Sequence, residues 1–291
     1  MLAMTIRTLI VCSSLLAAAC QTPSQPTSPT SQRPAPLLPN VDFARDLPVR
    51  ACFEIRDPGN GAVMKNDATL CATPRRPYST FKIANALVGL ESGLLTDATT
   101  LMPWDETLIP PNPAWPIAFP HGPITLQEAI RLSSVPHFRT LAAHLGPERM
   151  RAGLATLGYG NQNIDGGLTT FWLSGGLRIS ADQQLEFIDH LAHTQLPVSA
   201  RAQATMQQVL HVSDSGQAAR FGKTGTGEVE SEDGKPVDAS TPHLAWFVGW
   251  VQKRGAIYPF ALWIEAPGFD QARALRQKTL DAVLGDLGLA H

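Results

Sequence analysis

Apolar and polar positions recur with two different periods along the chain, and these periods divide it into strands and helices. Short apolar runs bounded by turn residues predict paired strands at residues 52–56 and 61–65. Three later aromatic-rich runs predict antiparallel strands at residues 218–223, 243–251 and 256–264. Helical spacing predicts the remaining elements, at residues 77–90, 125–132, 138–145, 147–157, 180–193, 199–209 and 271–287. The chain therefore leaves a sheet, builds an all-helical lobe and returns, which predicts an α+β fold with an antiparallel sheet flanked by helices.

The helix predicted from Pro77 onward belongs to the core. Pro77 is a start signal, Ile83, Leu87 and Leu90 share one helix face, and Gly93 supplies a stop. This helix connects the first strands to the helical lobe, so we expect it at the seam between them. Functional sites favour clefts of this kind.

Ser79 and Lys82 are the candidate reactive groups on this helix. They are three residues apart and share one face near the N-terminus, where backbone N–H groups are unpaired. A neighbouring base turns a serine hydroxyl into a nucleophile, and free N–H groups stabilise the oxyanion that its attack creates. The pattern indicates acyl transfer, with Lys82 as the base if its amine is uncharged. A surface serine and a solvated lysine on an ordinary amphipathic helix are the alternative.

Residues 1–20 have the pattern of an export segment. Arg7 precedes an uncharged run from Thr8 to Ala19, which is too short to span a bilayer and has the length of a signal-peptide core. Cys20 follows small residues, as the lipidated cysteine of a bacterial lipoprotein does, and simple cleavage after Ala19 is the alternative. We expect a periplasmic protein, anchored to the outer membrane if Cys20 is acylated.

Residues 21–40 are rich in Pro, Ser, Thr and Gln and predict a disordered, extended tether. Residues 41–291 then form the catalytic domain, which is long enough for two lobes around a cleft. The net charge is −2, and no basic stripe indicates nucleic acid as a partner. The sequence does not specify an oligomeric state.

Two cysteines, Cys52 and Cys71, lie outside the export segment. In an oxidising compartment such a pair predicts a disulfide across the turn at residues 57–61, and two inert buried thiols are the alternative. No metal is expected, because Cys-x-x-Cys is absent and His190 and His193 lack an obvious third ligand. We expect these histidines on a helix surface.

Six short motifs follow one another along the folded region. They are Ser79-Thr80-Phe81-Lys82, Ser133-Ser134-Val135, Tyr159-Gly160-Asn161, Phe171-Trp172-Leu173, Lys223-Thr224-Gly225 and Trp246-Phe247-Val248-Gly249-Trp250. In this order they resemble the class D (oxacillinase-type) serine β-lactamases, over nearly the whole folded region. The resemblance implies the fold of the penicillin-recognising serine enzymes, with the active site at the seam between sheet and lobe.

The resemblance also implies the chemistry. The β-lactam ring of penicillins would be hydrolysed through an acyl-enzyme on Ser79, which confers antibiotic resistance. Lys82 would react with CO₂ or bicarbonate to become N6-carboxylysine, whose carbamate is the general base, and the Trp172 indole N–H would hold it. No other cofactor is implied. We expect burial to lower the pKa of Lys82. The apolar neighbours that could bury it include Phe81, Val135, Trp172 and Leu173. For Val135 and Trp172, simple core packing is the alternative.

Further roles follow from the same resemblance. Ser133 would pass a proton to the departing ring nitrogen, unless it is only a capping serine. The oxyanion hole would be the backbone N–H groups of Ser79 and Thr226. The substrate would be bound by Lys223, Thr224, Gly225, Thr226 and Arg276. Lys223 and Thr224 are expected at a strand end, with an exposed turn as the alternative. Arg276 is expected to bind the substrate carboxylate, and the nearby Arg273 is a second candidate for this role. The alternative for Arg276 is an ordinary solvated arginine on a helix surface.

Other motif residues and the departures from the family pattern carry separate expectations. Tyr159 and Asn161 are expected to fix a loop of the helical lobe rather than to react. Tyr78 stands where the family more often has a small residue, which predicts a narrower rim. The long connection from Gly225 to Trp246 is acidic and is expected to border the entrance and disfavour anionic or bulky substrates. Its acidic residues are Glu228, Glu230, Glu232, Asp233 and Asp238.

Two other classes of protein share the serine and the lysine. A β-lactam sensor domain binds the drug and stays acylated, and a D,D-peptidase or transpeptidase acts on peptidoglycan. Such sensors normally follow several membrane-spanning helices, whereas this sequence has one export segment. The tryptophan after the glycine loop and the Tyr-Gly-Asn triplet favour the lactamase.

Overall fold

The computed structural model describes Met1 and residues 49–113, 115, 118–229 and 242–289. The expected export segment, Cys20 and the tether lie outside the described residues, as does the expected start of the domain near Val41. Within the described part of the chain, no helix combines the length and the hydropathy needed to cross a membrane.

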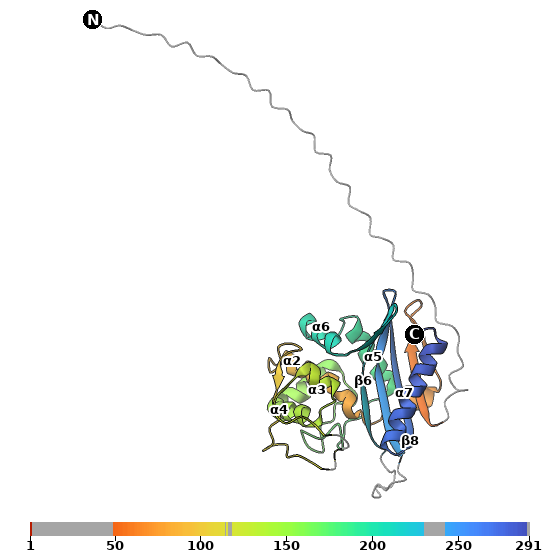
Figure 1. Ribbon diagram of the computed structural model, residues 1–291, viewed down its shortest axis with the longest axis horizontal. Helices are drawn as coiled ribbons and strands as arrows, with labels where there is room; N and C mark the ends of the chain where they lie inside the picture. The colour runs from red at the N-terminus through yellow and green to blue at the C-terminus, as the bar shows by residue number, and fades with distance from the viewer. Residues whose placement is uncertain (2–48, 114, 116–117, 230–241, 290–291) are drawn as a thin grey trace. The chain divides into compact units, whose positions relative to one another are not determined.

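A six-stranded antiparallel sheet forms the centre of the fold, in the order β2-β1-β8-β7-β6-β5 (Figure 1). Its strands are β1 (Ala51–Arg56), β2 (Val63–Lys65), β5 (His211–Ser215), β6 (Ala218–Glu228), β7 (Pro242–Lys253) and β8 (Ala256–Pro267). Because β1 pairs with β8, strands from both ends of the chain form one sheet, as the apolar pattern predicts. The pattern does not predict β5, a polar and largely exposed strand at the sheet edge.

The helices appear in the predicted order. They are α1 (Ala68–Ala72), α2 (Lys82–Glu91), α3 (Leu126–Arg131), α4 (Val135–Leu157), α5 (Ala181–Ala192), α6 (Ala200–Val209) and α7 (Phe269–Asp286), with a short ribbon of β3 (Leu101–Met102) and β4 (Ile124–Thr125). Thr125 and Glu128 form a capping box at the start of α3, and Ser180 and Gln183 form one at the start of α5. α4 contains a non-helical break at Gly146, followed by Pro147, where two separate helices were predicted. α1 was not predicted, because one short turn carries no periodic signal.

Helices cover both faces of the sheet, with α5 and α7 on opposite sides (Figure 1). Leu262 of β8 belongs to one apolar cluster with Leu280 of α7. Trp263, the next residue, belongs to the other cluster with Ile188 of α5. Successive strand residues point to opposite faces, so the central strands are apolar on both sides and appear in the sequence as continuous apolar runs.

Strand β6 is longer than predicted. It runs to Glu228, so Lys223 and Thr224 lie within the strand and not at its end, and Gly225 begins no loop. Hydrogen bonding to β7 extends from Ala218 to Glu228, although the three glycines of this stretch weaken its local strand signal. The connection between β6 and β7 is therefore shorter than expected. The remaining acidic residues assigned to it, Glu230, Glu232, Asp233 and Asp238, lie outside the described residues.

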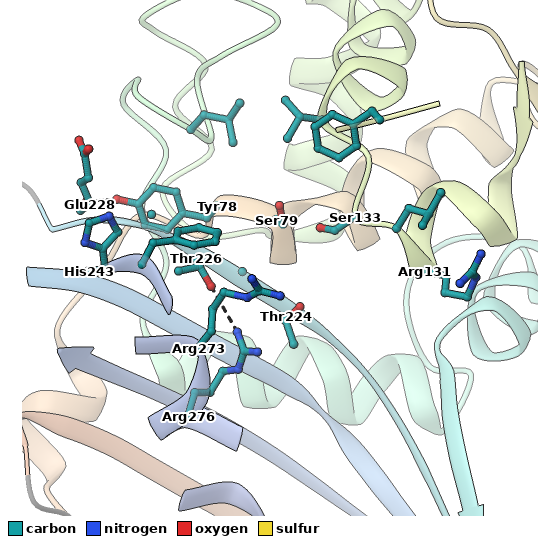
Figure 2. Close-up of a pocket in the computed structure, with 17 residues that line it drawn as sticks. Tyr78, Ser79, Arg131, Ser133, Thr224, Thr226, Glu228, His243, Arg273 and Arg276 are labelled. Atoms are coloured by element: carbon teal, nitrogen blue, oxygen red, sulfur yellow. Dashed lines mark hydrogen bonds between the residues drawn. The ribbon is translucent and has the colours of Figure 1, made fainter. Parts of the chain in front are cut away.

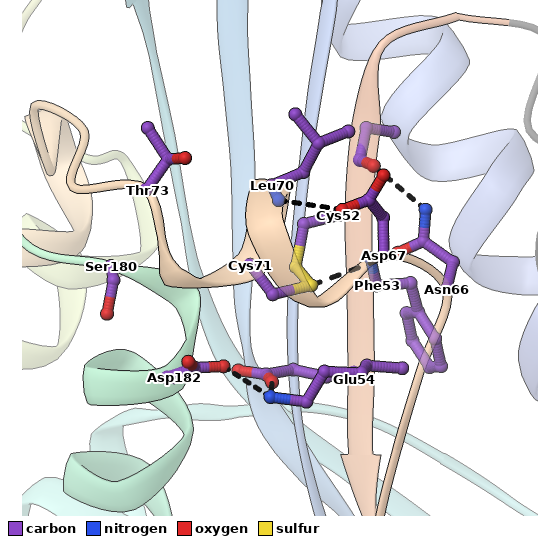
Figure 3. Close-up of a disulfide and its surroundings, with 12 residues drawn as sticks. Cys52, Phe53, Glu54, Asn66, Asp67, Leu70, Cys71, Thr73, Ser180 and Asp182 are labelled. Atoms are coloured by element: carbon purple, nitrogen blue, oxygen red, sulfur yellow. Dashed lines mark hydrogen bonds and ion pairs between the residues drawn. A yellow bond between two sulfur atoms is a disulfide. The ribbon is translucent and has the colours of Figure 1, made fainter.

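A disulfide joins Cys52 of β1 to Cys71 of α1 (Figure 3). The β1–β2 hairpin lies between them in sequence, and Cys71 follows it on a helix. Near this link Glu54 is fully buried, 3.2 Å from the Lys65 amine, which also donates a hydrogen bond of 2.6 Å to Asp182 of α5. Burial, with the Asp182 carboxyl beside it, raises the pKa of Glu54 to about 8. These covalent and polar links attach the hairpin to α1 and α5.

Candidate active site

A cavity of about 510 Å³ lies between the sheet and the helical lobe (Figure 2). Its wall is formed by the 3₁₀ turn η1 (Tyr78–Phe81), the turn between α3 and α4, strand β6 and the start of α7. Seven of the predicted site residues line it: Ser79, Ser133, Val135, Thr224, Gly225, Thr226 and Arg276. The other three, Lys82, Trp172 and Lys223, are buried residues. The structure therefore gathers four of the six motifs around one cavity.

Ser79 and Lys82 are in direct contact. The helix predicted from Pro77 begins as η1, which carries Ser79, and becomes α2 at Lys82. The Lys82 amine donates a hydrogen bond of 2.6 Å to the Ser79 hydroxyl oxygen. Tyr78, directly before the serine, has a left-handed backbone with φ of 50°. This conformation costs energy in a non-glycine residue and is often found at functional sites.

The Lys82 amine lies in an apolar environment. Lys82 is fully buried, and the ring of Phe138 is 5.7 Å from its nitrogen. The rings of Phe81 and Trp172 pack against each other with centroids 5.0 Å apart. Burial, followed by the charge of Lys223, lowers the pKa of Lys82 well below that of a free lysine. Phe138 was not among the predicted neighbours, because its apolar helical spacing indicates core without saying what the ring contacts.

Trp172 has an unusual indole group. Its side chain is buried, and the Nε1–H has no hydrogen-bond partner among the described residues. Buried donors are nearly always paired, because an unpaired one loses its bond to water without replacement. An acceptor within reach of the indole would satisfy it. Trp172 therefore offers a buried hydrogen-bond donor without an acceptor among the described residues, in the core cluster that also contains Phe81.

Ser133 forms a second serine–lysine pair. The Lys223 amine donates a hydrogen bond of 2.8 Å to the Ser133 hydroxyl and one of 2.9 Å to the Thr224 carbonyl. Ser133 has a φ of 51°, at the position after α3 where glycine is usual. Its N–H bonds to the Ile130 carbonyl, and the next N–H bonds to that of Ala129, as in a Schellman motif. The turn holds Ser133 at the cavity wall.

Gly225 allows β6 to approach the serine. A Cβ atom at this position would lie 2.8 Å from the Pro77 carbonyl oxygen and 3.0 Å from the backbone nitrogens of Ser79 and Thr80. Only glycine leaves room for this contact between two backbones. It brings the next residue, Thr226, beside η1, so the backbone near Thr226 and Ser79 borders the same part of the cavity.

The β6–α7 side of the cavity is positively charged. Arg276 is buried in α7, and its guanidinium donates a hydrogen bond of 3.3 Å to the Thr226 hydroxyl. Burial and the neighbouring Arg273 lower the pKa of Arg276 to about 10. Arg273 also lines the cavity but is exposed and paired with Asp270 at 3.4 Å. Arg276 is therefore the better placed of the two to bind an anion together with Thr224 and Thr226.

Tyr159 and Asn161 have structural contacts. The Tyr159 hydroxyl accepts a hydrogen bond of 3.3 Å from Gln184. Asn161 donates one of 2.9 Å to the Gly176 carbonyl and accepts one of 2.9 Å from the Arg178 N–H. Asn161 thus fixes the loop that carries Trp172, whereas Tyr159 is bound to α5, and neither residue lines the cavity.

The cavity wall contains His243 and Phe119, which the sequence analysis does not indicate, and also Tyr78 and Glu228, which it expects at the rim and the entrance. Glu228 and His243, opposite one another on β6 and β7, line the far end of the cavity, and Phe119 lines it near Val135. Tyr78 also lines it, and its hydroxyl donates to the Glu228 carbonyl. The Tyr78 ring lies over Gly227, where an added Cβ would be 2.1 Å from a ring carbon. None of these contacts has a local signal, because each joins segments that are distant in sequence.

A metal site is not formed by the described residues, which contain no cluster of three or more histidine, cysteine, aspartate or glutamate side chains. His190 and His193 lie on α5 and pair with Glu186 and Asp189 at 3.0 and 2.8 Å.

Comparison with known proteins gives a consistent result. The family model for the penicillin-binding protein transpeptidase domain matches residues 48–285. The β-lactamase OXA-10 of Pseudomonas aeruginosa is 34% identical over 224 residues, 76% of this chain and 78% of the relative. The β-lactamase OXA-48 of Klebsiella pneumoniae is 33% identical over 209 residues, 72% of each chain. Residues 48–285, which the family model matches, include all of the cavity residues named above.

Solved structures extend the likeness to the fold. FUS-1 (OXA-85), a class D β-lactamase from Fusobacterium nucleatum subsp. polymorphum, has a TM-score of 0.73 and 26% identity over 84% of this chain and 94% of its own. The class D β-lactamase YbXI from Nostoc has a TM-score of 0.73 and 30% identity, over 86% of this chain and 100% of its own.

The contact at Gly225 generates a prediction. Gly225→Ala places a methyl group against the backbone of η1, so we expect a loss of about 1–3 kcal/mol in the free energy of unfolding. Gly285→Ala on α7 is the matched control, because nothing lies within 4 Å of an added Cβ there. Chemical denaturation measures both variants. Equal stability of the two would contradict the close approach of β6 to η1.

Proposed function

The chain belongs to the class D β-lactamases, and we propose that it hydrolyses the β-lactam ring of penicillins and related antibiotics through an acyl-enzyme on Ser79. Enzymes of this class are serine hydrolases without a metal cofactor, and destruction of the drug confers resistance. The observation that carries the proposal is the 2.6 Å hydrogen bond between the Ser79 hydroxyl and the buried Lys82 amine. It places a nucleophile next to a group that burial keeps from being a plain ammonium.

Acylation uses both serine–lysine pairs. Ser79 loses its proton to the base at Lys82, its oxygen bonds to the lactam carbonyl carbon, and the N–H groups of Ser79 and Thr226 stabilise the resulting oxyanion. The carbon–nitrogen bond then breaks, and Ser133, hydrogen-bonded to Lys223, passes a proton to the departing nitrogen. Water subsequently attacks the ester, with the base at Lys82 again accepting a proton. The serine is thereby regenerated.

The modification of Lys82 is part of the proposal. A carbamate formed from CO₂ or bicarbonate on the Lys82 nitrogen would supply an anionic oxygen as general base. The unpaired, buried Nε1–H of Trp172 supports this, because it is a donor without an acceptor on a ring that packs against Phe81, the residue before Lys82. The apolar surroundings also keep the amine neutral, which is the form that reacts with CO₂.

Substrate recognition follows from the charged side of the cavity. Lys223, Thr224 and Arg276 bind the carboxylate that every penicillin carries, and Val135 packs against the substrate beside Phe119. Lys223 is buried and Arg276 nearly so, which strengthens their interaction with an anion relative to exposed side chains. Tyr78 and Glu228 narrow the end of the cavity near Gly227.

We also propose that the protein is exported to the periplasm, where Cys20 would carry a lipid anchor. The disulfide between Cys52 and Cys71 supports an oxidising compartment. The mass of the mature N-terminus measures whether Cys20 is acylated.

Ser79→Ala tests the proposed reaction. We expect the unaltered protein to complete many turnovers of a chromogenic cephalosporin, and we expect the variant to complete none, because it has no nucleophile. Mass spectrometry should show a covalent adduct on Ser79 during turnover. Ser92→Ala, at the opposite end of α2, is the control and should behave normally. A burst of one equivalent without turnover would indicate a sensor or a peptidase instead.

The protonation of Lys223 predicts how kcat/KM varies with pH. Burial, followed by the charge of Arg276, lowers the pKa of Lys223 to about 7, so the amine is a cation below that pH and neutral above it. Attraction for the substrate carboxylate is lost as the pH rises, and kcat/KM for benzylpenicillin should fall above pH 7, by at most about tenfold per unit. Lys223→Arg stays charged and should abolish this alkaline fall. An identical alkaline limb in both proteins would show that Lys223 is not responsible.

Trp172→Phe tests the carbamate. The variant keeps an aromatic ring but loses the indole donor, so we expect the acyl-enzyme to accumulate and deacylation to slow about a hundredfold. NMR with ¹³C-labelled bicarbonate should show a carbamate signal in the unaltered protein and a much weaker one in the variant. Trp263→Phe is a matched control. The buried indole N–H of Trp263 also lacks a hydrogen-bond partner in the described structure, but Trp263 lies on β8 outside the cavity. A normal carbamate signal in Trp172→Phe refutes the role of the indole.

A further inference from the structure

His137 is a fully buried histidine that the proposed reaction does not use. It lies in the first turn of α4, close to Ser133 in sequence. Both of its ring nitrogens have partners: Nδ1 is 2.7 Å from the Ser134 hydroxyl, and Nε2 is 2.9 Å from the Gly122 carbonyl oxygen. The ring thus connects the turn that carries Ser133 to the segment that follows Phe119.

The partners determine which nitrogen carries the proton. A carbonyl oxygen only accepts, so Nε2 must donate to Gly122. In the neutral ring Nδ1 then accepts, and the Ser134 hydroxyl donates to it. Burial lowers the pKa of His137, which favours this neutral form. The direction of both hydrogen bonds is therefore set by Gly122.

Ser134 is in an unusual position for a capping serine. It is the N-cap of α4, yet its hydroxyl makes no hydrogen bond to a backbone N–H of the first turn. Pro136 removes one of the usual partners, since proline has no N–H. The hydroxyl bonds instead to the side chain of His137, the residue whose backbone N–H a serine cap would ordinarily bind. An ordinary capping role does not explain this choice of partner.

Ser133 requires such support. It is in the left-handed region, at a position where glycine is usual, and its hydroxyl must meet both the Lys223 amine and the substrate. A strained residue persists only when its surroundings hold it from several sides. On the N-terminal side the Schellman motif does so, through the backbone N–H groups of Ser133 and Ser134. On the C-terminal side the side-chain contact between Ser134 and His137 is the corresponding restraint.

We propose that His137 is a positioning residue that holds the Ser133 hydroxyl in place for proton transfer, by fixing Ser134 through its hydrogen bond to Nδ1. Gly122 orients the ring, so the same residue attaches the Ser133 turn to the wall that carries Phe119. This inference rests on the proposed role of Ser133 as the proton donor to the departing nitrogen. His137 itself touches neither the substrate nor Ser79.

Two isosteres separate the two hydrogen bonds. In His137→Asn the side-chain amide lies where Nδ1 lies in the histidine, so its oxygen still accepts a hydrogen bond from Ser134. In His137→Gln the side-chain amide lies where Nε2 lies, so the variant keeps only the donor to Gly122. We expect His137→Gln to slow acylation about tenfold, in stopped-flow single-turnover measurements with a chromogenic cephalosporin. His137→Asn should lie within about threefold of the unaltered protein. Deacylation should be unchanged in both, because Ser133 serves the acylation step.

Ser134→Ala breaks the same contact from the other side. We expect the same tenfold loss of acylation rate, and the double variant with His137→Gln should lose no more than either single variant. In a Ser133→Ala background His137→Gln should have no further effect, since the group it positions is gone. Ser134→Ala also keeps the proposal testable if His137→Gln does not fold.

The control separates positioning from general destabilisation. Gln203 is buried in α6 and bonds the backbone of Leu196 and Val198, away from the cavity. Gln203→Leu should lower the melting temperature and the burst amplitude, which counts folded active sites, while leaving the acylation rate constant unchanged. The same behaviour in His137→Gln and Ser134→Ala would overturn the proposal, as would an undiminished effect in the Ser133→Ala background.

Failure of the proposed function gives a different result. In that case the unaltered protein does not turn over the cephalosporin and no adduct forms on Ser79. Normal turnover with unchanged acylation in His137→Gln and Ser134→Ala would refute only the role of His137.

Discussion

The burial of one lysine amine is the constraint on which the active site depends. A charged ammonium in the niche around Lys82 would cost several kcal/mol, and the described surroundings contain no carboxylate partner for it. The neutral amine is therefore favoured, and it lies against the Ser79 hydroxyl. The ring of Phe138 lies next to the Lys82 nitrogen, and Phe81 and Trp172 pack against each other in the same core cluster. Their packing serves the chemistry as well as the stability of the core, because a wetter niche would restore the ordinary lysine pKa.

Two of the strained backbone positions lie at the serines of the proposed mechanism. Tyr78 and Ser133 are both non-glycine residues with positive φ, and one precedes the nucleophile while the other is the proposed proton donor. Such a conformation costs about 1–3 kcal/mol and persists only where neighbours hold it. Tyr78 is held by its N–H bond of 3.2 Å to the Trp172 carbonyl and by its hydroxyl. The strained backbone thus holds the Ser79 and Ser133 hydroxyl groups at the wall of the same cavity.

Strand β6 and helix α7 supply the buried cations beside the cavity. Strand β6 carries Lys223 and Thr226, and α7 places Arg276 behind them, so two cations lie in a poorly solvated place next to the neutral Lys82. Burial lowers the pKa of both groups, and repulsion between like charges lowers it further, from Arg276 at Lys223 and from Arg273 at Arg276. A bound carboxylate relieves this repulsion, so the pocket is electrostatically complementary to an anionic ligand before that ligand arrives. Recognition and reactivity therefore come from different layers of the fold that meet at the Gly225 contact.

Local signals in the sequence were sufficient where a structure is encoded by neighbouring residues. The capping box at Thr125 starts α3, the turn after Arg56 closes the first hairpin, and the spacing of Ser79 and Lys82 places them together whatever lies around them. The order of strands and helices, and hence the fold class, followed from periodicity for the same reason. The motifs in their family order also indicated which residues to expect at the site.

Only the tertiary structure decided how distant segments meet. β6 continues past Gly225 because β7 supplies its hydrogen bonds, which no local pattern contains. The contact between Lys223 and Ser133 joins residues 90 positions apart. The unpaired indole of Trp172 and the bond between His137 and Ser134 depend on the direction of side chains, and packing sets that direction. The sequence by itself determined which groups the protein has for catalysis, and the packing of sheet against lobe determined which of them can act, because proton transfer requires contacts that spacing along the chain does not specify.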